Sequence, residues 1–213
     1  MLEIKKACIS YDNKTIFSDV DFLLKEGEIG CITGPSGSGK TSFLRALMGF
    51  IPLSKGEIYF NGLPLSPHSV EIVRREIAYV PQELSLPTEW VMDMINIPFS
   101  FKVNKVHPLI KEDLLENLQL LGLEKNILKK RTNEISGGQR QRIMLAVSTL
   151  LGKKLILTDE PTSALDINSC EKVLALFKKA CKKGIMVLAV THDLAFASAC
   201  DKILHINNNN END

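Results

Sequence analysis

Apolar residues along this chain form several short, nearly continuous runs. Such runs are typical of strands that are buried on both faces, as in the centre of a parallel sheet. They occur at residues 30–33, 77–80, 155–158 and 185–190. Three further strands are predicted at residues 2–10, 19–22 and 57–60, and the last of these ends at Asn61-Gly62, a strong hairpin turn signal. The front of the chain is therefore expected to contain antiparallel strands.

Apolar residues spaced three and four positions apart predict helices between these strands. The clearest helices are expected at residues 109–121, from Ser136 to about Leu150, and after residues 163–166, with shorter ones at 42–48 and 71–76. Residues 84–135 are more helical than their flanks, which predicts an inserted helical subdomain. Within it, residues 83–105 are rich in Pro, Met and aromatic residues and weak in period, so an irregular segment is expected there.

The composition is that of an ordinary globular chain, with 213 residues of which 45% are hydrophobic and 24% charged. We expect one domain over residues 1–206 and a disordered, asparagine-rich tail at 207–213. The formal net charge of +1 provides no basic footprint for nucleic acid, so no nucleic-acid partner is expected.

Two further features bear on the compartment. Five scattered cysteines without a C-x-x-C pair indicate buried thiols in a reducing environment. The first residues lack the apolar region of a signal peptide, and the longest apolar run is far too short to span a membrane. The sequence therefore predicts a cytoplasmic protein.

Residues 34–41 match G-x-x-x-x-G-K-[ST], the pattern of a phosphate-binding loop, and lie between a predicted strand and a predicted helix. The glycines let several backbone N–H groups point into one concavity, and the helix adds the positive end of its dipole. Lys40 supplies a charge for the β- and γ-phosphates, and the Thr41 hydroxyl is suited to bind Mg²⁺. The candidate nucleotide-binding residues here are Gly34, Pro35, Ser36, Gly37, Ser38, Gly39, Lys40, Thr41 and Ser42.

More polar side chains follow the predicted buried strands, at the sheet edge where α/β proteins bind ligands. Asp159 can hold Mg²⁺, and Glu160, one residue on, can face an attacking water molecule. His192 is placed to touch a phosphate, although a lone histidine is more often structural. Gln82 follows residues 77–80, and its amide is expected within reach of Mg²⁺ or the attacking water.

A second anion site is predicted where Ser136-Gly137-Gly138-Gln139 opens a helix. Ser136 is a favourable N-cap, and the two glycines leave backbone N–H groups exposed at the positive helix end. The sequence contains no second phosphate loop for this site to serve, and a flexible linker is the alternative interpretation. Tyr11, on an expected loop after the first strand, could stack on adenine or pack locally.

These motifs, in this order, resemble those of the ABC-type ATPases, the nucleotide-binding subunits of ATP-binding-cassette transporters. Tyr11 resembles the adenine-stacking aromatic, residues 34–41 the Walker A loop and Gln82 the glutamine loop. Residues 136–139 resemble the signature motif, preceded by Ile135 where the family usually has leucine. Residues 155–160 resemble Walker B with its catalytic glutamate, residues 163–166 the D-loop, and His192 the switch histidine.

The resemblance implies an α/β fold: a P-loop NTPase core, RecA-like and mostly parallel, with an antiparallel β subdomain and an inserted α-helical subdomain. It implies hydrolysis of ATP to ADP and phosphate, with Glu160, His192 and Gln82 as catalytic residues and Thr41, Gln82 and Asp159 as ligands of Mg²⁺. It also implies a head-to-tail dimer of two such subunits, expected to be identical. Each signature helix then caps the γ-phosphate held by the other subunit, so Ser136, Gly137, Gly138, Gln139 and Asp166 join the ATP-binding residues.

The family contains both transporter subunits and soluble machines. The soluble types of chromosome maintenance and translation carry long coiled coils or two cassettes, and this chain has neither. We therefore expect an energising subunit bound to a separate transmembrane permease at the inner face of the cell membrane. Residues 81–87 look similar to small bacterial cassettes of the iron-exporter type, which are close to lipoprotein-release and macrolide-efflux cassettes, so export is expected.

The permease is expected to dock in a groove between the catalytic core and the helical subdomain, lined by residues 83–101. This segment crowds soft and apolar side chains into a short space, which suits a surface for a partner helix. They are Leu84, Leu86, Trp90, Met92, Met94 and Phe99. The alternative is that these residues pack the helical subdomain onto the core.

Overall fold

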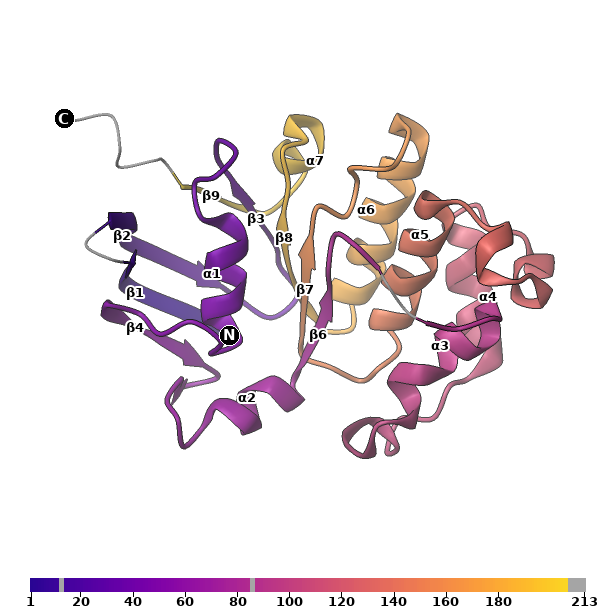
Figure 1. Ribbon diagram of the computed structural model, residues 1–213, viewed down its shortest axis with the longest axis horizontal. Coiled ribbons are helices and arrows are strands. Elements are labelled where there is room, and N and C mark those ends of the chain that lie inside the picture. The colour runs from indigo at the N-terminus through magenta and orange to yellow at the C-terminus, as the bar shows by residue number, and fades with distance from the viewer. Residues whose placement is uncertain (12–13, 85–86, 207–213) are drawn as a thin grey trace.

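Two β-sheets and a group of helices make up the computed structural model, which describes residues 1–11, 14–84 and 87–206 (Figure 1). The side chains of Tyr11 and Lys14 lie outside this description, as does the predicted tail at 207–213. The strands are β1 (Leu2–Tyr11), β2 (Lys14–Leu24), β3 (Ile29–Thr33), β4 (Lys55–Phe60), β5 (Leu63–Pro64), β6 (Ile77–Val80), β7 (Leu155–Asp159), β8 (Met186–Val190) and β9 (Lys202–His205).

The helices follow the same element order. They are α1 (Lys40–Leu47), α2 (Val70–Arg75), α3 (Val91–Ser100), α4 (Lys111–Leu120), α5 (Gly137–Ser148), α6 (Ile167–Cys181) and α7 (Leu194–Ser198). Three 3-10 turns lie in the helical part, namely η1 (Lys102–Asn104), η2 (Lys125–Lys129) and η3 (Thr132–Glu134). None of the described helices combines the length and the apolar character that a bilayer crossing requires.

The central sheet is parallel and has the strand order β6-β7-β8-β3-β9. Every residue of β3, β7 and β8 is buried, which confirms that the apolar runs are central strands. Successive side chains of a strand point to opposite faces. Accordingly, Leu155 and Leu157 pack toward α1 and the antiparallel sheet, whereas Ile156 packs toward α5 and α6. This two-sided burial explains why β7 begins with three apolar residues and carries polar ones only at its carboxyl end, Thr158 and Asp159.

The second sheet is antiparallel, with the order β2-β1-β4-β5. Asn61 (φ 49°) and Gly62 (φ 79°) form the tight turn between β4 and β5, as the Asn-Gly pair predicts. Strand β2 is longer than the predicted residues 19–22, because it pairs with β1 along nearly its whole length and this pairing overrides its polar positions. Together the two sheets confirm the expected α/β class.

The helices between Val91 and Glu134 lie inside the interval predicted for the helical insert. The expectation of an irregular segment over residues 83–105 is wrong for α3, which is helical and even contains Pro98. Val91, Met94 and Ile95 are buried at the spacing of one helix face and contribute to the same core as α5. The apolar residues of α3 do have a helical spacing. The proline and aromatic residues around them make this spacing hard to recognise when residues 83–105 are considered together.

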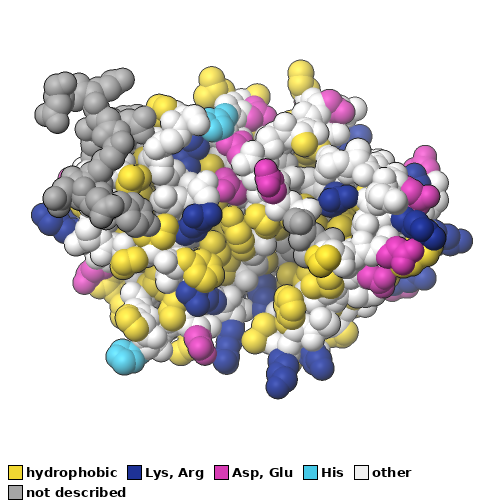
Figure 2. All heavy atoms as spheres, viewed as in Figure 1, with side chains coloured by type: hydrophobic (Ala, Val, Ile, Leu, Met, Phe, Trp, Pro, Cys, Tyr) yellow, Lys and Arg dark blue, Asp and Glu magenta, His cyan; other side chains and the backbone are white. Residues whose placement is uncertain are grey.

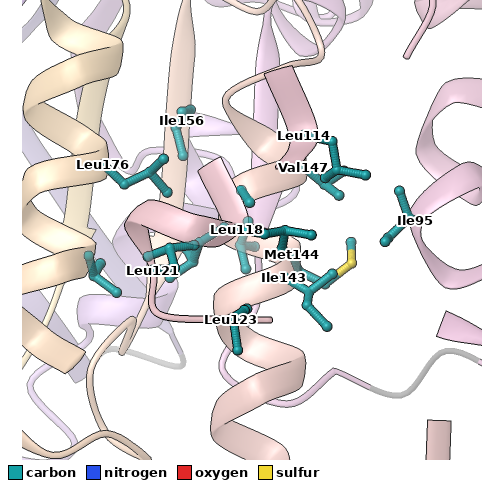
Figure 3. Packing of buried hydrophobic residues seen from close by; sticks show 14 of the residues in the cluster. Ile95, Leu114, Leu118, Leu121, Leu123, Ile143, Met144, Val147, Ile156 and Leu176 are labelled. Atoms are coloured by element: carbon teal, nitrogen blue, oxygen red, sulfur yellow. The ribbon is translucent and has the colours of Figure 1, made fainter. Parts of the chain in front are cut away.

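Helix α5 lies in the middle of the larger apolar cluster, where Ile143, Met144 and Val147 meet side chains from the insert and the central sheet (Figure 3). Leu118 of α4 has an exposed fraction of 0% in this cluster. The insert and the catalytic core therefore share one continuous packed interior.

The first prediction concerns this shared interior. Replacing Leu118 with alanine should lower the free energy of unfolding by about 2–5 kcal/mol, because a buried leucine loses its transfer energy and leaves a cavity. Chemical denaturation would measure this change. Ile167→Ala is the matched control, since Ile167 is 83% exposed and should change stability by less than about 0.5 kcal/mol. Equal effects of the two variants would contradict the packing described here.

The five cysteines are free, but the expectation that all are buried thiols is wrong. Cys31 on β3 is buried, whereas the other four are half-buried: Cys8 lies on β1, Cys170 and Cys181 on α6, and Cys200 between α7 and β9. A hydrogen bond with Cys200, together with burial, raises the pKa of Cys31. Burial raises the pKa of Cys181 to about 12. These two thiols are therefore protonated at neutral pH.

Candidate nucleotide site

A cavity of ≈ 950 Å³ opens at the carboxyl edge of the parallel sheet. Its walls come from the loop after β3, from the residues that follow β6, β7 and β8, and from the beginnings of α6 and α7. Most of the polar residues predicted from strand ends line it, namely Ser36, Gly37, Gly39, Lys40, Thr41, Ser42, Gln82, Asp159, Glu160 and His192. Chain segments more than 100 residues apart in sequence thus meet at one edge, as parallel strands require.

The phosphate loop has a backbone that only glycine tolerates at two points. At Gly34 (φ 154°) a Cβ atom would lie 2.1 Å from the carbonyl oxygen of Ile206. At Gly39 (φ 91°), the N-cap of α1, it would lie 2.1 Å from Cγ2 of Ile16. Ser38 is fully buried below the loop, and its hydroxyl has no partner among the described residues. The loop therefore wraps tightly over the start of α1, where the free N–H groups favour an anion.

Lys40 lies across this loop. Its ammonium group donates hydrogen bonds to the carbonyl oxygens of Gly34 (2.9 Å) and Pro35 (2.7 Å). Burial lowers the pKa of Lys40, and the carboxylates of Glu160 and Asp159 oppose that shift. A buried ammonium beside a nest of N–H groups is suited to bind a polyphosphate.

Two oxygen donors from distant parts of the chain meet beside Lys40. The Thr41 hydroxyl donates a hydrogen bond of 2.9 Å to Oδ2 of Asp159. Asp159 is the last residue of β7 and is 5% exposed. A hydroxyl and a carboxylate held together in a phosphate site are the kind of ligands that Mg²⁺ uses, with water and phosphate completing its shell.

Glu160 begins the turn after β7 with an unusual backbone. Its φ of 50° is rare for a residue with a side chain and marks a sharp bend at the strand end. The backbone N–H of Glu160 donates to the carbonyl oxygen of Val190 on the neighbouring strand (2.8 Å). This bond fixes the bend, so the carboxyl group projects into the cavity.

His192 lies next to that carboxyl group. Its Nε2 is 3.2 Å from Oε1 of Glu160, and its backbone N–H donates to Oε2 (3.4 Å). Burial raises the pKa of Glu160 above its usual value, while His192 acts to lower it. The Glu160 carboxyl is 10% exposed and the His192 ring 53%, so the histidine faces the opening and the glutamate the interior. A carboxylate with a raised pKa is a stronger general base.

The signature residues are placed differently. Ser136 is the N-cap of α5, where its side chain accepts a hydrogen bond from the backbone N–H of Gln139 (3.1 Å). The Gln139 side chain in turn accepts from the backbone N–H of Ser136 (3.0 Å). This reciprocal cap confirms that the Ser-Gly-Gly stretch begins a helix and is not a flexible linker. Neither Ser136, Gly137, Gly138 nor Gln139 lines the cavity. The start of α5 is therefore separate from the cavity of its own subunit.

Among the described residues, four more predicted ATP-binding residues do not line the cavity, namely Gly34, Pro35, Ser38 and Asp166. Asp166 caps α6, where its carboxylate accepts from the backbone N–H of Ser169 (2.7 Å), a bond that lowers the pKa of Asp166. The helix cap expected at residues 163–166 is confirmed. Tyr11 was expected on a loop, but it is the last residue of β1. Its side chain lies outside the described residues.

The sequence patterns did not reveal Gln141 as a neighbour of the site. Its side chain, 4% exposed, donates a hydrogen bond to the carbonyl oxygen of Glu160 (3.3 Å) and so connects α5 to the turn after β7. The sequence patterns also did not predict an apolar part of the cavity, which is formed by Leu165, Cys170, Leu174, Phe196 and Ala199. A buried glutamine on a helix face that is otherwise apolar was the available signal for the first of these contacts.

The model of the family "ABC transporter" matches residues 17–163 of this chain. The chain belongs to the ABC transporter family. It is thus the ATP-binding subunit that energises transport in an ABC transporter, and it hydrolyses ATP to ADP and phosphate. The phosphate-binding loop predicted from the sequence lines the cavity at the carboxyl edge of the sheet.

Relatives of this ABC ATPase include both import and export subunits. It is 32% identical over 205 residues to the "Probable iron export ATP-binding protein FetA" of Escherichia coli, covering 96% of this chain and 90% of the relative. It is 33% identical over 211 residues to the "Spermidine/putrescine import ATP-binding protein PotA" of Mesoplasma florum, covering 97% of this chain and 59% of the relative. The chain thus spans about three fifths of the import subunit.

Two solved structures of the same fold, both of one cassette, are dimeric. The ATP-binding cassette MJ0796, in a "post-hydrolysis state" bound to ADP and phosphate, superimposes with a TM-score of 0.80 at 29% identity, covering 97% of this chain and 94% of that one. A second dimeric structure of the same cassette has a TM-score of 0.81 at 28% identity, covering 98% and 95% of the two chains. This ABC ATPase accordingly has the architecture of a dimeric cassette.

Proposed function

We propose that this ABC ATPase works as a homodimer that holds two ATP molecules between its subunits and drives a separate membrane permease. One observation carries the proposal: the signature residues form an exposed helix start that does not line their own subunit's cavity. A helix N-terminus of this kind favours an anion. A second copy, related by a two-fold axis, brings each signature to the other copy's phosphate loop and closes both sites.

The residues of the site fit a Mg²⁺ ion. Thr41 and Asp159 would hold it, and Gln82, exposed after the end of β6, would reach it from the strand next to β7. When bound, Mg²⁺ neutralises charge on the β- and γ-phosphates. The chain's own residues do the remaining work. Lys40 and the loop N–H groups hold the phosphates, and Ser136 and the N–H groups of Gly137 and Gly138 cap the γ-phosphate across the interface.

Glu160 acts as the general base toward the attacking water in this proposal. Its raised pKa, its burial and its fixed position beside His192 support the role. His192 is half exposed at the mouth of the cavity, where it can donate a hydrogen bond to the γ-phosphate and hold the Glu160 carboxyl in place. The test of the ATP sandwich is therefore a comparison of dimer formation with and without ATP in a variant that hydrolyses ATP slowly.

The permease partner would dock where the catalytic core meets the helical insert. Figure 2 shows apolar side chains gathered on the face between α1, α2 and the insert. On the core side the exposed apolar residues are Phe50 (63%), Ile72 (56%) and Tyr79 (37%), and on the insert side Trp90 (41%). Phe50 packs against the Arg74 guanidinium, whose carbon lies 4.2 Å from the ring centroid. This surface suits an amphipathic helix of a partner.

The expected lining of that groove needs correction. Met94 is buried in the core of the insert, and Leu84, Met92 and Phe99 pack against the same core, so the alternative interpretation holds for these residues. Leu86 lies outside the described residues. Of the six residues named for the groove, Trp90 remains as an exposed aromatic, and Phe101 at the end of the segment is exposed as well. The core side of the groove was missed because its residues are scattered along the chain.

A second prediction tests the groove. Trp90→Ala should weaken co-purification of the cassette with its permease by about tenfold or more, because buried tryptophans dominate many interfaces. ATP binding by the isolated subunit should stay unchanged, since Trp90 is not part of the cavity. Its indole contacts only one neighbouring guanidinium, that of Arg131 at 5.1 Å, so folding should survive.

Val106→Ala is the matched control for this experiment, since Val106 is 75% exposed on the same insert but lies outside the predicted groove segment. It should leave the complex intact. The proposal that the permease docks in this groove would be contradicted if Trp90→Ala left the complex unchanged. It would also be contradicted if the complex were lost only because the variant is less stable to heat.

We also propose export as the direction of transport, at the cytoplasmic face of the membrane. Its support is the resemblance of residues 81–87 to iron-exporter cassettes and the similarity to an iron export subunit. An import subunit has nearly the same sequence identity to this chain. The direction of transport is therefore expected to depend on the permease. Identifying the permease that co-purifies, and the side on which it takes up cargo in vesicles, tests this proposal.

A further inference from the structure

One arginine connects the glutamine loop to the signature helix. Arg140 lies in the first turn of α5, and its Nη2 donates a hydrogen bond of 2.9 Å to the carbonyl oxygen of Thr132. Its Nη1 donates to the carbonyl oxygen of Leu84 (3.3 Å), which lies two residues after Gln82. Its Nε is buried without a partner among the described residues. The guanidinium group thus bridges two backbone segments that are 48 residues apart in sequence.

The same two segments are joined further along. The backbone N–H of Val91 donates to the carbonyl of Lys130 (3.1 Å), and that of Thr132 donates to the carbonyl of Glu89 (2.9 Å). Trp90 and Arg131 form an isolated β-bridge at this point, and the Arg131 guanidinium lies 5.1 Å from the Trp90 ring centroid. The chain returning from the glutamine loop is therefore fixed to the chain that leads into the signature.

We propose that Arg140 is a positioning residue that makes the signature turn move together with the glutamine loop. This inference rests on the proposed function, in which Gln82 contacts the metal or water of one site and Ser136 caps the phosphate of the other. A displacement at Gln82 moves the Leu84 carbonyl, and the guanidinium carries that displacement to the first turn of α5. ATP arriving in one site therefore adjusts the signature that the subunit offers to the opposite site.

The chemistry of arginine suits this task. Its planar group presents several donors in fixed directions, so it can hold two carbonyl oxygens at a set separation. A lysine ammonium is a single point on a flexible chain and can satisfy one of the two carbonyls at a time. Hydrogen bonds from a charged donor are also stronger than neutral ones, which makes the connection stiff.

The chain offers a matched control two residues later on the same helix. Arg142 donates to the carbonyl oxygens of Leu121 (2.8 Å) and Gly138 (3.3 Å), so it connects α5 to the end of α4. It forms the same kind of two-carbonyl contact as Arg140. It does not contact the glutamine loop among its described hydrogen bonds. Replacing either arginine by glutamine removes one guanidinium group and its two hydrogen bonds to carbonyl oxygens, and only Arg140 bonds the segment that follows Gln82.

The experiment is a double-mutant cycle between Gln82→Ala and Arg140→Gln in the full chain. Arg140→Gln should lower kcat of ATP hydrolysis by about tenfold or more, since it removes two charge-assisted bonds. KM for ATP should stay unchanged, because Lys40, Thr41 and Asp159 are untouched. The double variant should be no slower than the slower single variant, as expected when two residues act along one route. Arg140→Lys should be intermediate.

The control arm pairs Gln82→Ala with Arg142→Gln, whose effects on kcat should multiply. Multiplying effects for Gln82 and Arg140, or a rise in KM equal to the fall in kcat, would overturn the inference. If Arg140→Gln lowers the unfolding temperature, Arg140→Lys takes its place in the double-mutant cycle with Gln82→Ala. Failure of the ATP sandwich would appear separately, as a chain with native Arg140 that binds ATP without forming a dimer.

Discussion

Replacing Glu160 with glutamine should slow ATP hydrolysis by about 10²–10⁴-fold while the subunit still binds ATP. The variant keeps the shape of the side chain and removes the group that accepts a proton. In the proposed mechanism Glu160, beside His192 in the cavity, acts on the attacking water, whereas Lys40 and the loop hold the phosphates. Binding of ATP should therefore persist without the Glu160 carboxylate. Single-turnover hydrolysis and equilibrium binding of ATP would measure the two quantities separately.

Asp159→Asn is the matched control, because it makes the same change one residue earlier in the chain. The Asp159 carboxylate contacts the Thr41 hydroxyl and would hold Mg²⁺, so this variant should weaken the nucleotide complex itself. Hydrolysis at the wild-type rate by Glu160→Gln would rule out Glu160 as the base. A loss of ATP binding as large as that of Asp159→Asn would show that the carboxylate binds nucleotide.

Adding a bulky side chain at Gly137 should abolish the ATP-driven dimer and leave ATP binding to the monomer nearly intact. Apart from its chain neighbours and the backbone of its own helix, a Cβ atom at Gly137 would meet no atom of the described residues within 4 Å, so Gly137→Phe should fold normally. Across the proposed interface the same position faces the γ-phosphate of the second copy. Light scattering with ATP in the Glu160→Gln background, where hydrolysis is slow, would report the dimer.

Two comparison variants make this result specific. Gln119→Phe adds an equally large group on the exposed face of α4 and should leave the dimer unchanged. Gly138→Ala instead brings a methyl group within 2.8 Å of the carbonyl oxygen of Ala164, so it should lower stability in the monomer. Parallel loss of dimer and of monomer binding in Gly137→Phe would mean that the signature serves its own subunit's site.

Local chemistry explains which parts of the fold could be predicted from the sequence. The central strands β3, β7 and β8 are buried throughout and are apolar except at the carboxyl ends of β3 (Thr33) and β7 (Thr158 and Asp159), since both faces are covered, and this pattern is readable without a structure. The phosphate loop, the Asn61-Gly62 turn and the Ser136 cap each depend on residues of one short, continuous stretch of the chain. Helix α3 escaped prediction because its three buried residues lie beside Pro98 and exposed aromatics.

The sequence by itself determined the strand runs, the phosphate loop, the helix caps and the order of polar residues at strand ends. Only the tertiary structure decided which of these residues meet. It placed His192 against Glu160, Thr41 against Asp159 and Gln141 below the turn after β7, through contacts that span 19 to 118 residues. It also kept the signature out of its own cavity. Such contacts depend on strand order and helix packing. These are determined by residues throughout the chain, so they leave no short-range pattern in the sequence.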